Sequence, residues 1–228
     1  MYELFPFPPT KGEQAKRRLL LAALKQIGEK GYDNASTREI SDEAGQNVAS
    51  IAYYFGNKEK LYLEVLNGIG GYLQALMGPI GEETRAGLDS GTLDPAAATH
   101  LLKRVLRLSL GHQLEGQEFL KIRLVIMREQ AAPCASFEVL YQNAIRPLHE
   151  MFGRLLAVAI GEEPDSMKLM LRAHAIFGQV LVFTIARATI LRRLGIERFE
   201  SRHVALISQI LDEHIDRLCG GGPFPQHS

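Results

Sequence analysis

A stretch near the N-terminus, residues 36–60 (STREISDEAGQNVASIAYYFGNKEK), constrains the fold of this 228-residue chain more than any other. Ser36 and Glu39 form the pattern of a capping box, in which each side chain caps a backbone amide of the other residue. A helix should therefore start near Ser36, and Gly45 permits a tight turn after it. Two short helices joined by such a turn predict a helix-turn-helix, a common DNA-reading geometry.

The second helix of this pair is expected over residues 48–55, after an Asn47 cap. Ile51 and Phe55 lie one turn apart in it and should pack into the preceding helices, which leaves Ala49 and Ser50 nearer the exposed side. Small residues at the start of an exposed helix allow close approach to base edges. This pattern favours a helix that reads DNA.

Polar residues around this helix are suited to contact phosphates. Tyr53 and Tyr54 end it, Lys58 follows the cap residue Asn57 at the start of a third helix, and Thr37 starts the first helix of the pair. Each also has a simpler interpretation. The tyrosines fit the edge of a core, Lys58 fits a solvated surface, and Thr37 fits a second capping position.

The overall charge gives no indication of a nucleic-acid partner, because Lys plus Arg and Asp plus Glu both number 26. Any basic surface must be local. The two cysteines, Cys134 and Cys219, lack the spacing of a disulfide framework or a zinc site, which favours reduced thiols in the cytoplasm. The longest apolar stretch, residues 169–191, contains Arg172 and Arg187, so we expect a buried helix there and no membrane partner.

Apolar residues recur at helical spacing through almost the whole chain, which predicts an all-α fold. We expect Leu20, Ala23, Leu24 and Ile27 to form the inner stripe of the first helix. The expected helices cover 11–30, the helix-turn-helix pair, 58–77 ended by Gly78-Pro79, 95–112, 117–130, 136–160 with a kink or a restart at Pro147, 165–194 and 201–219. The expected domains are a disordered tail (1–10), the DNA-binding domain (11–56), a helical ligand-binding and dimerisation domain (57–219) and a second disordered tail (220–228).

Residues 11–66 resemble the DNA-binding domain of TetR-type transcriptional repressors. The matching pattern is Thr37-x-x-Ile40-x-x-x-Ala44-Gly45, then Ser50-Ile51-x-Tyr53-Tyr54-Phe55-x-Asn57-Lys58-Glu59-x-Leu61. The resemblance implies base contacts from Val48, Ala49 and Ser50. It implies phosphate contacts from Thr37, Tyr53, Tyr54 and Lys58, with Lys11, Lys16 and Arg17 also near the DNA backbone.

The chain departs from the family pattern at two positions. Gln46 stands where an apolar turn residue is usual, and Ala52 replaces a frequent tyrosine. The reading helix also has no Arg or Lys, so it offers no bidentate guanine contact. Base readout should then depend on small-residue contacts, DNA shape or water.

The C-terminal half resembles the CecR-like branch of the same family. The matching stretches are Phe119-Leu120-x-x-Arg123, Arg128-Glu129-Gln130, Arg146-Pro147-Leu148-His149 and Phe177-Gly178-Gln179-Val180. The resemblance implies a homodimer with a pocket for a small-molecule effector. The candidate pocket residues lie on helices of the ligand-binding domain and mix aromatic, methionine and polar side chains. They are Arg123, Met127, Met151, Phe152, His174, Phe177 and Phe183. Such residues also suit a plain core.

The last two long helices carry more apolar surface than one core contact needs, which favours a second subunit as partner. The candidate interface residues are Leu181, Ile185, Leu206, Ile207, Ile210 and Leu211. A helix buried deeply within one subunit is the alternative.

Two other classes of function compete with a homodimeric, ligand-released repressor of a pseudo-palindromic operator. An enzyme is not expected, because the sequence contains no nucleophile elbow, P-loop or dinucleotide fingerprint, and no cofactor is expected either. The second alternative is a helical interaction protein that keeps the helix-turn-helix and no longer reads a specific DNA sequence.

Overall fold

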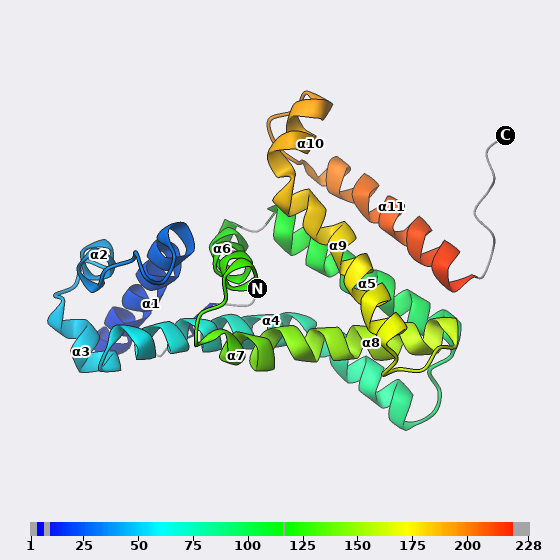
Figure 1. The fold of residues 1–228 in the computed structure, drawn as a ribbon, viewed down its shortest axis with the longest axis horizontal. Coiled ribbons are helices and arrows are strands. Elements are labelled where there is room, and N and C mark those ends of the chain that lie inside the picture. The colour runs from blue at the N-terminus through cyan, green and yellow to red at the C-terminus, as the bar shows by residue number, and fades with distance from the viewer. Residues whose placement is uncertain (1–3, 7–9, 116, 221–228) are drawn as a thin grey trace. The chain divides into compact units, whose positions relative to one another are not determined.

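The computed structural model describes residues 4–6, 10–115 and 117–220, and these ranges form helices without any strand (Figure 1). The prediction of an all-α fold is confirmed. The chain divides into two compact units. The first comprises Met1–Leu76 and Gln117–Pro147, and the second comprises Met77–Gly116 and Leu148–Ser228.

Helix α4 (Lys58–Asp89) contributes to both units. The other elements of the first unit are α1 (Lys11–Lys30), α2 (Thr37–Glu43), α3 (Ala49–Phe55), α6 (Gln117–Ala131), α7 (Phe137–Leu140) and a π-helical turn, η1 (Tyr141–Ile145). Those of the second unit are α5 (Pro95–Glu115), α8 (Arg146–Ile160, which starts at the end of the first unit), α9 (Met167–Ile185), α10 (Arg187–Leu194) and α11 (Ser201–Cys219).

Helix α1 forms the centre of the first unit, where it packs against α2 and α6. The predicted inner stripe of α1 is confirmed, because Leu20, Ala23, Leu24 and Ile27 are all buried. Gly31 ends the helix with its amide bonded to the Ile27 carbonyl at 2.8 Å. The first unit therefore places α6, from the middle of the sequence, directly against the N-terminal helix.

The prediction that Gly78-Pro79 ends the connecting helix is wrong, because α4 continues through Pro79 to Asp89. A proline inside a helix leaves the carbonyl four residues earlier without its amide donor. Here that carbonyl belongs to Ala75, and both Ala75 and Pro79 are exposed. Water can satisfy the free carbonyl, so the helix tolerates the proline.

Pro147 has the effect that the sequence predicts, since the helical run over residues 137–160 is irregular just before it. The five residues of η1 form a π-helical turn, and α8 restarts at Arg146. Pro147 has no amide to donate to the carbonyl of Asn143, and that carbonyl instead accepts a hydrogen bond from Nε2 of Gln74 at 2.8 Å. The side chain of Asn143 also donates to Asn67 at 3.0 Å. The proline thus leaves the Asn143 carbonyl without its helical donor, and Gln74 of α4 bonds to it.

The single helix expected over residues 165–194 is two helices, α9 and α10, with a break at Ala186. The backbone there leaves helical geometry, with φ −95° and ψ 21°. Beyond the break, the Arg187 guanidinium lies over the Phe199 ring, 5.1 Å from its centroid. This contact links the start of α10 to the segment between α10 and α11.

Of the N-terminal tail that we expected to be disordered, the structure describes residues 4–6 and Thr10, and Leu4 and Phe5 are buried. The Phe5 ring occupies the space beside Gly68, where a Cβ atom would lie 2.0 Å from the ring. The Phe5 carbonyl accepts a hydrogen bond from Nε of Arg17 at 3.2 Å. These contacts hold the segment against α1 and α4. Apart from Gly220, the C-terminal tail lies outside the described residues.

The second unit is built around α5, which packs against α9 and α11. Thr184 of α9 donates a hydrogen bond to Gln113 of α5 at 2.8 Å, and Arg107 of α5 forms an ion pair with Asp212 of α11. Among the described helices, only α9 is long and apolar enough to cross a membrane, a test that core helices of soluble proteins also pass. Its contacts with α5 are those of a packed helix.

Candidate nucleic-acid interface

The start of each helix in the helix-turn-helix carries the cap that the sequence predicts. The capping box is present, with the Glu39 amide donating to the Ser36 hydroxyl at 3.1 Å and the Ser36 amide donating to the Glu39 carboxylate at 2.9 Å. Oδ1 of Asn47 accepts a hydrogen bond from the Ala49 amide at 2.9 Å, and Oδ1 of Asn57 accepts one from the Lys60 amide at 2.8 Å. We call α2, α3 and the turn between them the reader. Its helix starts are therefore fixed by hydrogen bonds between residues that are close in the sequence.

The turn between α2 and α3 passes through Gly45, which adopts a left-handed conformation with φ 62°. Gln46 is one of the residues that depart from the family pattern. Its backbone amide donates to the Ser41 carbonyl at 2.9 Å. Its side chain donates to the Gly45 carbonyl at 2.9 Å. A polar residue is accommodated in this turn because hydrogen bonds satisfy it.

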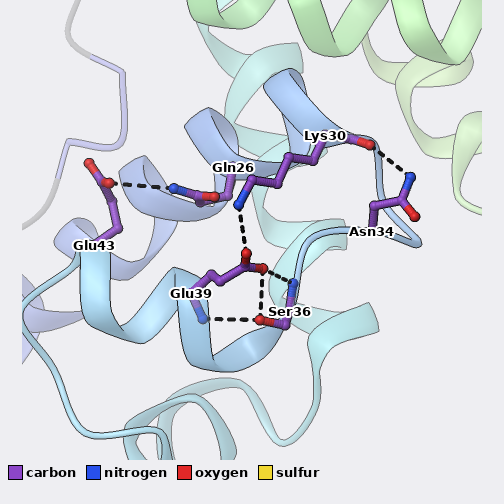
Figure 2. A network of polar contacts seen from close by, with 6 residues as sticks. All are labelled: Gln26, Lys30, Asn34, Ser36, Glu39 and Glu43. Atoms are coloured by element: carbon purple, nitrogen blue, oxygen red, sulfur yellow. Dashed lines mark hydrogen bonds and ion pairs between the residues drawn. The ribbon is translucent and has the colours of Figure 1, made fainter.

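Ion pairs and hydrogen bonds join α2, the first helix of the reader, to α1 (Figure 2). Lys30 bonds to the Glu39 carboxylate at 2.7 Å, and Lys25 bonds to the Glu43 carboxylate at 2.7 Å. Lys30, then the Ser36 amide and hydroxyl, lower the pKa of Glu39 to about 2. Because both lysines are paired with carboxylates, neither presents an uncompensated charge to a phosphate.

The buried and exposed sides of α3 divide as predicted. Ile51 and Phe55 are buried, whereas Ala49 is exposed and Val48, just before the helix, is 43% exposed. Ser50 is half-buried. The candidate base-reading residues thus lie together at the start of α3, on a tip without charge.

The candidate phosphate-binding residues lie around this tip. Tyr53 is 82% exposed and packs edge-on against the half-buried Tyr54, with ring centroids 4.9 Å apart. Thr37 is half-buried in the first turn of α2, and Lys58 is half-buried in the first turn of α4. An exposure of 82% for a large aromatic side chain is not the value of a core-edge residue, so Tyr53 is free to reach a partner.

Helix α1 contributes its first turns to the same region. The Tyr54 hydroxyl lies beside Gly12, 3.7 Å from where a Cβ atom would be, and the Lys16 ammonium lies 5.8 Å from the Phe55 ring centroid. Arg17 differs from the prediction in that its Nε donates to the Phe5 carbonyl. That nitrogen holds the N-terminal segment and is not available to DNA in this structure.

A buried pair that the sequence analysis did not single out links α4 to α6. The Tyr62 hydroxyl donates to Oε1 of Glu129 at 2.6 Å, and Oε2 of Glu129 accepts from the Cys134 amide at 3.2 Å. Burial, then the hydrogen bond to Glu129, raise the pKa of Tyr62 well above its ordinary value, so the hydroxyl is a neutral donor. No local signal could reveal this pair, because its members are 67 residues apart.

The residue before Glu129 ties α6 to the end of α1. Nε of Arg128 donates to the Gly28 carbonyl at 2.7 Å, and another guanidinium nitrogen donates to the Glu29 carbonyl. Carbonyls in the last turn of a helix have no intrahelical donor, and a cation is favoured there. Arg128 therefore caps α1 from α6.

The candidate pocket residues fall in both units. Arg123 and Met127 are half-buried on α6 of the first unit, and the other five lie on α8 and α9 of the second. Phe152 and Phe177 are buried with ring centroids 4.5 Å apart. Met151 and Phe183 are half-buried, and His174 is exposed.

His149, which we did not predict as a pocket residue, joins these rings into one cluster. Its ring centroid lies 4.6 Å from that of Phe177 and 4.5 Å from that of His174. Burial of the ring, then the nearby His174, lower the pKa of His149 to about 4. Its Nδ1 is buried without a hydrogen-bond partner among the described residues. The cluster therefore runs from the buried Phe152 to the exposed His174 and contains one polar atom, Nδ1 of His149, that lacks a hydrogen bond.

The candidate dimer residues divide into two groups. Leu181 and Ile185 on α9, and Leu206 and Ile210 on α11, are exposed by 39–64%. Ile207 and Leu211 are instead buried in the core of the second unit, where α11 packs against α5. Only the first group offers apolar surface to another subunit.

Comparison with known proteins agrees with this geometry. Residues 19–65 match the family model described as bacterial regulatory proteins, tetR family, and residues 98–222 match that of the HTH-type transcriptional dual regulator CecR, C-terminal domain. The CecR protein of Shigella flexneri is 37% identical over 216 residues, covering 95% of this chain and 96% of that protein. The repressor NicS of Pseudomonas putida is 36% identical over 59 residues, 26% of this chain and 28% of that protein.

Solved structures show the same fold. A TetR-like regulator from Rhodococcus sp. RHA1 matches with a TM-score of 0.64 at 19% identity, covering 95% of this chain and all of that chain. The hemolysin II regulator HlyIIR matches with a TM-score of 0.60 at 22% identity, covering 89% and 99% of the two chains.

A capped helix-turn-helix at the N-terminus of an all-α chain defines a DNA-binding transcriptional regulator, and such proteins are not enzymes. The chain belongs to the TetR family, with a C-terminal half of the CecR type.

Proposed function

We propose that the protein is a cytoplasmic homodimer that represses transcription from a pseudo-palindromic operator and is released by a small-molecule effector. The observation that carries the proposal is the capped reader, whose exposed α3 tip is surrounded by hydroxyl and ammonium groups suited to phosphates. A dimer places two readers on one DNA duplex, and its two-fold symmetry requires a palindromic site.

The base contacts of the proposal come from Val48, Ala49 and Ser50. The phosphate contacts come from Thr37, Tyr53, Tyr54, Lys58, Lys16 and Arg17. Without Arg or Lys on α3, hydroxyl and methyl contacts supply the direct readout, and the remaining specificity comes from DNA shape or bridging water.

The dimer surface of the proposal is the exposed apolar face of α9 and α11. Leu181 and Ile185 are one helical turn apart, as are Leu206 and Ile210, so each pair forms a short apolar stripe. Large exposed apolar residues that line up along neighbouring helices mark an interaction surface. A second copy of the chain would cover them in a four-helix interface.

The effector site of the proposal includes the ring cluster of the second unit, because aromatic rings beside one polar atom that lacks a hydrogen bond suit an aromatic or apolar effector that forms one hydrogen bond. An effector releases the operator only to the extent that it binds the DNA-incompetent form more tightly.

The test is to select bound fragments from a pool of random DNA with the purified protein and to determine the mass of the complex. A palindromic consensus bound by two subunits supports the proposal. Weak binding without a consensus would favour the alternative, an interaction protein that no longer reads a specific sequence. The relative CecR is named a dual regulator and NicS a repressor. A reporter gene placed behind the selected operator therefore decides between repression and activation.

A further inference from the structure

The side chain of Lys58 is held against an aromatic ring. Its ammonium lies over Tyr32, 4.4 Å from the ring centroid. Tyr32 is half-buried in the loop between α1 and α2, and Lys58 is half-buried at the start of α4. A cation within about 6 Å of a ring face is attracted by the electron density of that face.

Two lysines in the second half of α1 are held in a different way. Lys25 and Lys30 are paired with the carboxylates of Glu43 and Glu39, each at 2.7 Å. A carboxylate partner cancels most of the charge that a phosphate would meet. A neutral ring restrains the ammonium and leaves its charge intact, with N–H donors still available to a phosphate oxygen. The Tyr32 ring thus holds the Lys58 ammonium without neutralising it, as a contact with a DNA phosphate requires.

Tyr32 is itself supported from within the first unit. Its ring centroid lies 5.1 Å from that of Tyr62, with 33° between the ring planes. Tyr62 is fully buried, and its hydroxyl is fixed by Glu129 of α6 at 2.6 Å. The second carboxylate oxygen of Glu129 is fixed by the Cys134 amide. The ring under Lys58 therefore rests on a buried side chain that hydrogen bonds hold in place.

We propose that Tyr32 is a positioning residue that presents the Lys58 ammonium to a DNA phosphate, with Tyr62 and Glu129 holding the ring. The inference rests on the proposed function, in which Lys58 contacts a phosphate. A free lysine side chain loses rotamer freedom when it binds. Restraint over the ring removes part of that loss before DNA arrives, and preorganisation of this kind strengthens binding.

The test is a double-mutant cycle on the selected operator with the full-length protein, using Tyr32→Leu, Lys58→Ala and the double variant. Tyr32→Phe is the matched control, because it keeps the ring and removes only the hydroxyl. We expect Tyr32→Leu to raise Kd about two- to fivefold per subunit, the range that corresponds to an exposed cation–π contact. Tyr32→Phe should keep the wild-type Kd, and Tyr32→Leu should have no further effect when Lys58 is alanine.

Three results would overturn the inference. The first is an equal loss from Tyr32→Leu in both backgrounds, which is the behaviour of a merely structural residue. The second is a loss from Tyr32→Phe as large as that from Tyr32→Leu. The third is an unchanged Kd and salt dependence for Lys58→Ala, which would also remove Lys58 from the proposed phosphate contacts. The first two leave that contact standing, so the two failures are distinguishable.

A second measurement does not depend on DNA or on the stability of the leucine variant. Protons close to a ring face are shifted upfield in NMR spectra, so the ε-methylene protons of Lys58 should be shifted in the free wild-type protein. Tyr32→Phe should keep this shift. A wild-type resonance at the position of an exposed lysine would overturn the inference.

Discussion

Replacing Tyr62 by phenylalanine should destabilise the protein by about 2–3 kcal/mol, although the change removes a single oxygen atom. Tyr62 is 1% exposed and Glu129 is 4% exposed, so neither group of the 2.6 Å hydrogen bond has access to bulk water. A hydrogen bond to a charged group contributes about 1.5–3 kcal/mol, and a buried polar atom left without a partner costs a similar amount. The phenylalanine ring fills the same space, so the cavity is small.

The assay is urea unfolding followed by far-UV circular dichroism at a fixed protein concentration, because association also stabilises the folded chain. The matched control is Tyr141→Phe, the same chemical change at an exposed tyrosine. We expect this control to change the free energy of unfolding by less than about 0.5 kcal/mol.

The background variant Glu129→Gln separates the buried charge from the hydrogen bond. An amide oxygen can still accept from Tyr62, but no charge is left unsatisfied when the hydroxyl is removed. Tyr62→Phe should therefore cost less in the Glu129→Gln protein than in the wild type. A loss below about 0.5 kcal/mol for Tyr62→Phe in the wild type would refute the reasoning, because it would mean that Glu129 does not depend on this donor.

Four further predictions concern the DNA contacts, the dimer and the half-buried His149. Lys58→Ala should weaken binding to all DNA sequences and reduce the salt slope of binding by about 1 per subunit, measured by fluorescence anisotropy at several salt concentrations; an unchanged slope would contradict the phosphate contact. Ser50→Ala should alter the preferred base at one half-site position, and an identical consensus in repeated selection would argue against base reading by Ser50. Ile185→Glu should yield monomers in analytical ultracentrifugation, whereas a glutamate at the exposed Ala131 of α6 should leave the dimer intact; a dimeric Ile185→Glu protein would remove this face from the interface. The pKa of His149 falls from 6.5 to about 4 on folding, so the unfolded chain binds the proton more readily. The free energy of unfolding should therefore fall as the pH drops from 6.5 to 4, by about 1–2 kcal/mol for a partly exposed ring. His149→Phe should lack this pH dependence, and parallel pH profiles of stability for the two proteins would contradict the prediction.

The parts of the reader that the sequence predicts are those specified by neighbouring residues. Ser36 and Glu39 are three residues apart, and Asn47 and Asn57 each cap an amide two or three residues ahead. A hydrogen bond of such short range needs no knowledge of the remaining fold. For the same reason the burial of Ile51 follows from helical periodicity alone.

The features that the sequence does not predict depend on solvent exposure or on distant partners. Pro79 is a helix breaker by local rules, and α4 continues through it at a position where Ala75, the residue whose carbonyl loses its donor, is exposed to solvent. The Phe5 ring is buried because Gly68, far along the chain, leaves room for it. Ile207 has the same apolar character as Leu206, and only the packing of α11 on α5 decides which of them faces a partner.

The uncharged tip of α3 separates affinity from specificity in the proposed reader. Val48, Ala49 and Ser50 contribute no net charge, so the salt-dependent part of binding must come from the groups around them. Lys58 is one of the cations placed to supply it, and Tyr32 restrains that cation without neutralising it. A change at Tyr32 or Lys58 should then alter affinity equally for every DNA sequence. A change at Ser50 should alter the ranking of sequences and leave the salt slope unchanged, so the two kinds of contact can be measured separately in the same protein.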